Sequence, residues 1–156
     1  MGQPMVVINI NQLTPHPRNV RQGDIGAIAT SLQTFGQYRP IIYQKTTRHI
    51  IAGNHTWKAA KQLGWKEIQA QSFDCDDDTA LRILIADNRA TDLATYDDTA
   101  LLELLKELAA TEKELDGTLF DGDDLQRLLD DTTPPPPPEP ATIICPECGA
   151  QITQQP

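Results

Sequence analysis

Hydrophobic residues along the first 130 positions fall into short apolar runs that alternate with helical spacings. Each run is bounded by turn residues, as strands usually are. Four strands are therefore predicted, at Met5–Ile10, Pro40–Tyr43, His49–Ala52 and Glu67–Phe73. The polar stretch Gln44–Arg48 joins the second strand to the third, which indicates a β-hairpin.

Apolar residues at spacings of three and four predict five helices. The first begins after Asp24, a good N-cap, and ends before Gly36, where a helix C′ residue is expected. The others are predicted from Gly53 to Leu63 and over Thr79–Asn88, Asp97–Leu108 and Asp121–Leu129. The side chains expected on buried faces are Ile25, Ile28, Leu32, Phe35, Leu81, Leu84, Ile85, Leu101, Leu104, Leu105, Leu108, Leu125, Leu128 and Leu129. Helices and strands in this order favour an α+β fold, a small mixed sheet with packed helices.

The composition changes sharply after the last predicted helix. Five consecutive prolines, Pro134–Pro138, form a polyproline II spacer that cannot join a packed core. We therefore divide the chain into a domain over residues 1–131, a linker over 132–140 and a short cysteine-containing tail over 141–156. The chain contains no apolar run long enough to cross a membrane, and its start is not that of a secretion signal, so a cytoplasmic protein is expected.

The net charge of −9 hides an asymmetry along the chain. Residues 1–74 carry eight Lys and Arg against three Asp and Glu, whereas residues 75–133 carry five against seventeen. The basic half suits an anion such as a phosphate group. The acidic half argues against strong non-specific binding to DNA, which depends on neutralising the phosphates of the backbone.

The segment around Gly53 is the strongest candidate for a binding site. A buried strand runs into a glycine turn and then directly into a helix, which aims free backbone N–H groups and the positive helix end at one spot. Glycine there would let a phosphate approach the backbone closely, and no side chain is expected to be tolerated. Lys58 adds positive charge nearby. The alternative is an ordinary connection between a strand and a helix, with Asn54 or Thr56 as the cap.

Three segments together resemble the nucleotide-site motifs of the ParB N-terminal domain, in the same order and with similar spacing. They are Gly36–Ile41, Gly53–Ala59 and Ala86–Leu93, against family patterns that read roughly G-x-x-Q-P-I, G-E-R-R-x-x-A and E-N-x-x-R-x-D-L. The opening Leu13–Asn19 is also similar to the start of that domain. The resemblance covers about residues 6 to 130. It implies the ParB/sulfiredoxin-like fold, and it is closest to the stand-alone proteins of phages and mobile elements.

The resemblance also implies a nucleotide with Mg²⁺. Carried over by residue, the phosphates would lie at Gly53, Asn54, His55 and Thr56, and the metal at Asp87 and Asn88. Hard oxygen donors of this kind suit Mg²⁺, although an acid and an amide at a helix end are also common caps. This chain has Asn54, His55 and Thr56 where the family has Glu-Arg-Arg, so two arginines are missing, and Arg39 replaces the family glutamine. The sulfiredoxin branch needs a cysteine where Asn54 stands, so sulfinic acid repair is not expected.

The three cysteines are predicted to have different roles. Cys75 is expected to be structural, because its acidic neighbours disfavour a thiolate. Cys145 and Cys148 look like one half of a zinc site. Structural zinc needs four ligands, so two tails would have to share one metal in a homodimer. The alternative is a thiol pair with no metal.

Three functions follow from these patterns. The first is a nucleotide-binding regulatory or accessory protein that binds CTP or ATP with Mg²⁺ and serves DNA transactions, through DNA-processing proteins or indirectly with DNA. The second is an enzyme, namely a slow NTPase, a phosphotransferase or a nuclease. A nuclease needs clustered carboxylates for two metals, and Asp74 with Asp76–Asp78 is the dense cluster. The third is a non-catalytic protein-interaction module.

Overall fold

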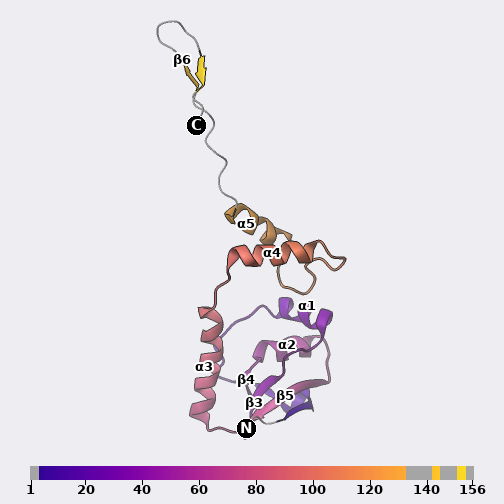
Figure 1. The fold of residues 1–156 in the computed structure, drawn as a ribbon. Helices are drawn as coiled ribbons and strands as arrows, with labels where there is room; N and C mark the ends of the chain where they lie inside the picture. Colours follow the sequence, from indigo (N-terminus) through magenta and orange to yellow (C-terminus); the bar gives the residue numbers. More distant parts are fainter. Residues whose placement is uncertain (1–3, 133–141, 145–150, 154–156) are drawn as a thin grey trace.

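The computed structural model describes residues 4–132, 142–144 and 151–153 (Figure 1). Residues 4–132 form five α-helices and five strands. The strands are β1 (Met5–Asn9), β2 (Thr14–Pro15), β3 (Ile41–Gln44), β4 (His49–Ala52) and β5 (Glu67–Phe73), and the 3-10 helix η1 (Ile10–Gln12) follows β1. The helices are α1 (Ile25–Phe35), α2 (Asn54–Gln62), α3 (Asp77–Leu93), α4 (Asp98–Ala109) and α5 (Gly122–Thr132).

The strands form one mixed sheet in the order β1-β5-β3-β4-β2. β3 and β4 pair antiparallel as the expected hairpin, whereas β3 and β5 run parallel, with Ile41 opposite Ala70. β1 lies antiparallel to β5 at one edge, and the two-residue β2 lies parallel to β4 at the other. β2 is not among the four strands predicted from the sequence. The α+β fold with a small mixed sheet is confirmed.

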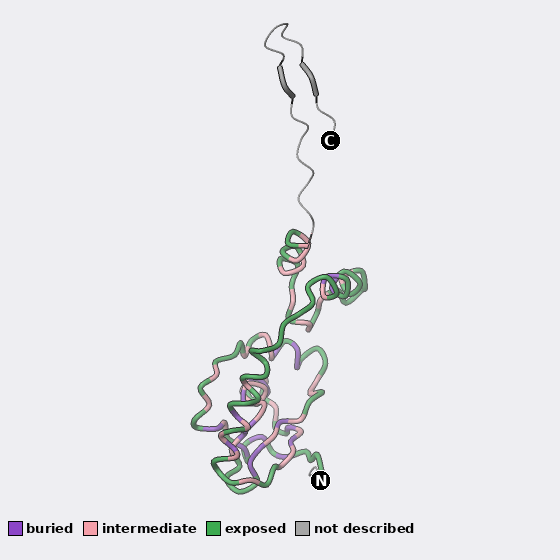
Figure 2. The backbone as a smooth tube through the Cα atoms, turned by 60° about the vertical axis from the view of Figure 1, so that its left-hand side comes forward, coloured by how far each residue is buried: buried purple, intermediate pink, exposed green. Residues whose placement is uncertain are grey.

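The two faces of the sheet are covered by different helices. α1 and α2 pack together on one face, over a core that includes Ile41, Ile50 and Ile68. Ile51 follows Ile50 and therefore points to the opposite face, where it is fully buried and where α3 packs along β4. Figure 2 shows that the buried positions concentrate in this sheet and its adjoining helices, while α4 and α5 lie beyond them with mostly exposed surfaces.

α1 and α3 show how well caps and periodicity define a helix. α1 begins and ends as predicted, because the Asp24 carboxylate accepts the N–H of Ala27 and Gly36 adopts a φ of 70°. Its buried face differs, since Phe35 is 55% exposed. α3 is longer than predicted at both ends. Asp76 caps it by accepting the N–H of Thr79, and the helix continues to Leu93 through residues that are all exposed. An exposed turn leaves no apolar period in the sequence.

α4 and α5 pack against each other beyond the sheet domain. The side chains of α4 buried in the structure are Leu102 and Leu105, whereas Leu104, which was predicted to be buried, is 59% exposed. The loop between the two helices contacts the end of α1. Gly117 lies so close to Phe35 that a Cβ on it would be 2.5 Å from a ring carbon of Phe35. In the described part of the chain no helix is long and apolar enough to cross a membrane.

The tail contributes a two-stranded antiparallel sheet, β6 (Thr142–Ile144) with β7 (Gln151–Thr153). Cys145 and Cys148 lie outside the described residues. The predicted domain boundary at 131 falls one residue before the end of α5.

Candidate functional site

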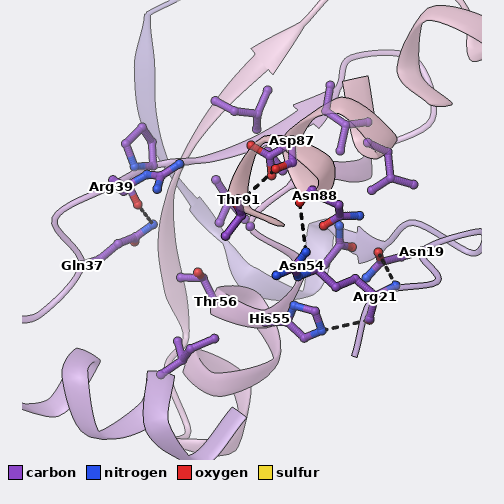
Figure 3. Close-up of a pocket in the computed structure, with 18 of the residues that line it drawn as sticks. Asn19, Arg21, Gln37, Arg39, Asn54, His55, Thr56, Asp87, Asn88 and Thr91 are labelled. Atoms are coloured by element: carbon purple, nitrogen blue, oxygen red, sulfur yellow. Dashed lines mark hydrogen bonds between the residues drawn. The ribbon is translucent and has the colours of Figure 1, made fainter. Parts of the chain in front are cut away.

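A cavity of about 420 Å³ lies where the three motif segments meet (Figure 3). Its walls come from the loop around Arg21, from α1, from residues 37–42, from the turn between β4 and α2, and from α3. Of the residues proposed from the sequence, those that line it are Arg39, Gly53, Asn54, His55, Thr56, Asp87 and Asn88. Lys58 lies one helical turn further along α2 and is not part of this lining.

The first turn of α2 faces this cavity without a side-chain cap. Gly53 occupies the N-cap position with a φ of 88°, and no side chain among residues 4–132 caps the first turn. The first backbone bond of the helix runs from the N–H of Trp57 to the Gly53 carbonyl, at 3.0 Å. The N–H groups of His55 and Thr56 therefore remain available, and the positive end of the helix macrodipole reinforces them. This arrangement suits an anion.

Gly53 was expected to let a phosphate approach the backbone, but the structure shows that a side chain there would clash with the core. A Cβ placed there would lie 2.6 Å from Cγ2 of Ile41, a fully buried residue of β3, and the positive φ also disfavours a side chain. Gly53 therefore lets the turn pass close to the core. A larger residue would disturb folding itself. A Gly53→Val variant would therefore not separate an effect on ligand binding from an effect on stability.

Asn54 holds the turn in place from the inside. The side chain is buried, its Oδ1 accepts the backbone N–H of His16 at 2.9 Å, and its Nδ2 donates to the Ile50 carbonyl at 3.1 Å. Both amide atoms are thus engaged with the backbone of the domain. Asn54 can offer a ligand only its own backbone N–H.

His55 connects α2 to the loop that precedes α1. Its Nε2 lies 3.0 Å from the backbone nitrogen of Gly23 and 3.2 Å from the carbonyl oxygen of Arg21. The neutral ring with the proton on Nδ1 accepts from Gly23, whereas a protonated ring would donate to Arg21 instead. Burial and the nearby charge of Lys58 lower the pKa of His55, which favours the neutral form.

Arg21 was not singled out from the sequence, where one arginine in a polar loop gives no spacing signal. It lines the cavity, and its Nη1 donates to the Asn88 carbonyl at 3.0 Å and pairs with Asp92 at 2.6 Å. The arginine therefore ties the first loop to α3 across the cavity. Its guanidinium has further N–H groups, so it can also contact a ligand.

Gln37 is a second residue that the sequence did not indicate. Its Nε2 donates to the carbonyls of Arg39 and Gln69, at 2.9 and 2.8 Å, and its Oε1 accepts the N–H of Gln69 at 2.7 Å. These bonds pin the segment before β3 against β5. The Arg39 side chain is left exposed, at the wall of the cavity.

Asp87 and Asn88 lie inside α3 rather than at its end, so neither caps the helix. Nδ2 of Asn88 is buried and has no hydrogen-bond partner in the part of the chain that the structure describes. An unsatisfied buried amide beside a cavity fits a site that a ligand completes. Within the described residues no group of three or more His, Cys, Asp or Glu side chains could hold a metal ion. A Mg²⁺ ion here would need ligand phosphates in addition to the oxygens of Asp87 and Asn88.

The acidic cluster at the start of α3 is already committed to structural contacts. Asp74 pairs with Lys45 and Asp78 with Arg82, while Asp76 caps α3 and Asp77 accepts from Gln44. Carboxylates used in this way do not form the convergent pair that a two-metal nuclease needs. Burial, followed by the charges of Asp76, Asp74 and Asp77, raises the pKa of the Cys75 thiol, as expected for a structural cysteine.

Comparison with known proteins identifies the family. The model of the ParB N-terminal domain matches residues 3–89. The chain is 28% identical over 119 residues to the nucleoid occlusion protein of Oceanobacillus iheyensis, which covers 70% of this chain and 42% of that protein. It is 34% identical over 88 residues to the probable chromosome-partitioning protein ParB of Campylobacter jejuni, which covers 53% of this chain and 32% of that protein. The chain thus spans less than half the length of these relatives.

A solved structure supports the same assignment. The C-terminally truncated chromosome-partitioning protein ParB from Caulobacter crescentus, complexed with CTP-gamma-S, superposes with a TM-score of 0.63 at 21% identity. The match covers 74% of this chain and 71% of that one, which shows a shared fold. Because the family model matches more than half of the chain and the fold agrees, this chain belongs to the ParB N-terminal domain family.

Proposed function

We propose that the chain is a ParB-like regulatory or accessory protein that binds a nucleoside triphosphate in the cavity between α2 and α3. One observation carries the proposal: three segments that are distant in the sequence meet around the uncapped N-terminus of α2. Backbone N–H groups at a helix start bind phosphates with no need for a dense cluster of cations. This matters here, because the second motif contains His55 and Thr56 in place of arginines.

Two arginines would supply the positive charge. Arg21 and Arg39 reach the cavity from the loop before α1 and from the segment before β3. Asp92 partly neutralises Arg21, so Arg39 carries the freer charge. A triphosphate would therefore depend on Mg²⁺ to offset its charge, with Asp87 and Asn88 facing the metal.

The cytidine nucleotide is the first to test, since the Caulobacter relative was solved with CTP-gamma-S. A regulatory role is favoured over a nuclease, because the dense acidic cluster is held in helix capping and ion pairs. A role in DNA transactions agrees with the names of the relatives, which refer to chromosome partitioning and nucleoid occlusion.

Isothermal titration calorimetry with CTP, ATP and GTP, with and without Mg²⁺, tests the proposal. We expect saturable binding of at least one triphosphate, stronger with Mg²⁺. Arg39→Gln should weaken it by roughly tenfold, the loss expected for one charge-assisted hydrogen bond. Lys113 is exposed and is not among the residues that line the cavity, so Lys113→Gln removes one positive charge outside the site and should leave the affinity unchanged. Equal weakening by both variants would show that Arg39 acts only through the net charge of the protein and not through a contact with the ligand.

A further inference from the structure

A second cavity, of about 230 Å³, lies on another part of the domain. This open cavity is lined by the residues after β2, by the β3–β4 hairpin near its turn and by the first turns of α3. The residues that line it are His16, Pro17, Arg18, Gln44, Thr47, His49, Asp77 and Leu81, and none of them lines the larger cavity. A cavity with its own set of lining residues calls for a separate explanation.

His16 presents a hydrogen-bond donor to this cavity. The residue is 9% exposed, and its Nδ1 accepts the backbone N–H of Arg18 at 3.1 Å. A neutral imidazole that accepts at Nδ1 carries its proton on Nε2. No hydrogen bond within the described part of the chain uses that N–H. The tautomer also argues against a metal ligand, because Nε2 has no free lone pair.

His49 and Arg18 provide further donors. The two imidazole rings meet edge to face, with centroids 5.5 Å apart, and no described contact hydrogen-bonds the His49 ring. Arg18 is exposed, and none of the ion pairs among the described residues includes it. After burial itself, the positive charges of His49 and Arg18 are what lower the pKa of His16. Three of the residues that line this cavity, His16, His49 and Arg18, therefore have donors without a partner among the described residues, and an acceptor-rich ligand such as an oxyanion would satisfy them.

Asp77 is the one carboxylate in this lining, and its orientation is fixed. Its Oδ1 accepts from Nε2 of Gln44 at 2.9 Å, and the same Nε2 donates to the Cys75 carbonyl at 3.1 Å. Gln44 is itself held by the Thr47 hydroxyl, which donates to its Oε1 at 2.5 Å. The second oxygen of Asp77 remains an acceptor. It would repel a fully deprotonated anion and accept from an anion that retains an O–H.

We propose that this cavity binds a phosphate group that still carries a proton. Its oxygens would accept from His16, His49 and Arg18, and its O–H would donate to Asp77. Inorganic hydrogen phosphate meets this requirement at neutral pH, and a phosphate monoester meets it near its second pKa of about 6. Sulfate and the phosphodiesters of DNA have no such O–H, so the carboxylate discriminates against them.

The chain has three histidines, which allows a direct test by NMR of their imidazole resonances. His16 and His49 report on this cavity and His55 on the larger one. Phosphate, sulfate and chloride would be titrated at matched ionic strength and at a fixed pH near 6.5. Phosphate is expected to shift His16 and His49 saturably, with an affinity at least tenfold above that of sulfate. Equal shifts with sulfate, or no saturable shift, would overturn the proposal, whatever His55 shows.

Two variants sharpen the test. Asp77→Asn retains an acceptor for Gln44 but removes the negative charge, so phosphate and sulfate should bind it with similar affinity. Arg18→Gln should weaken phosphate binding by about tenfold, and Lys113→Gln should not change it.

Methyl phosphate and a short duplex DNA distinguish the sources of the ligand. Binding of methyl phosphate extends the site to monoesters, whereas a shift of His16 and His49 by duplex DNA as large as that by phosphate contradicts the role of Asp77.

Discussion

Substitution of Gly53 by alanine tests whether this glycine is required by the core or by a ligand. The new Cβ would approach Cγ2 of Ile41 to 2.6 Å, at a φ of 88°. A left-handed conformation costs a non-glycine residue about 1–2 kcal/mol, and overpacking a core costs about 1–3 kcal/mol more. Gly53→Ala should therefore lower the free energy of unfolding by about 2–5 kcal/mol with no ligand present.

Urea denaturation followed by circular dichroism measures this change, and Ile41→Ala provides the matched partner. Ile41→Ala alone removes buried methyl groups and should cost about 2–5 kcal/mol. In the double variant the new Cβ at position 53 enters the space that the Ile41 side chain vacates, so the combined loss should be smaller than the sum of the two single losses. A Gly53→Ala protein as stable as the original would refute the packing argument. Strictly additive losses would show that the clash with Ile41 is not the cause.

Four further predictions concern the metal, pH, DNA and the tail. Asp87→Ala should weaken nucleotide binding in Mg²⁺ by several-fold and leave it unchanged in EDTA, as measured by calorimetry; equal weakening in both would exclude a metal-facing role. Burial lowers the pKa of both His16 and His55. The free energy of unfolding should therefore be level above pH about 6.5 and decrease as the pH falls below it, and melts that are flat between pH 7 and 5 would contradict this. Gel shifts at physiological salt should show little affinity for random duplex DNA, given seventeen acidic residues against five basic ones over residues 75–133, and tight sequence-independent binding would be incompatible with that charge. Light scattering should detect a zinc-dependent dimer that a chelator or Cys145→Ser with Cys148→Ser dissociates, and a monomer with or without zinc would remove the shared site.

The fold could be predicted well because its elements carry local signals. Asp24 and Gly36 mark the ends of α1, and β4 and β5 begin and end where their apolar runs do. The errors fall where a tertiary contact decides. The pairing of β2 with β4 is too short to leave a pattern, and Leu102 is buried on a helix that packs against α5, a contact that the spacing of apolar residues does not specify.

The candidate site was predictable in location but not in its internal contacts. Ordered motifs placed Gly53, Asp87 and Asn88 at one cavity. They did not reveal that Asn54 is turned into the domain, nor that Arg21 crosses to α3. Those contacts join positions 38 and 67 residues apart, and a single sequence carries no spacing that reports them.

The central claim is that nucleotide phosphates bind at the uncapped start of α2. Amide NMR of the full chain during titration with CTP and Mg²⁺ tests this claim most directly, with ATP and GTP as further ligands. We expect the backbone amides of His55 and Thr56 to shift saturably and more than those of β1 and α5, and Arg39→Gln to move the midpoint to higher nucleotide concentration. Saturable binding that leaves these two amides unmoved, or the absence of binding by all three nucleotides, would contradict it.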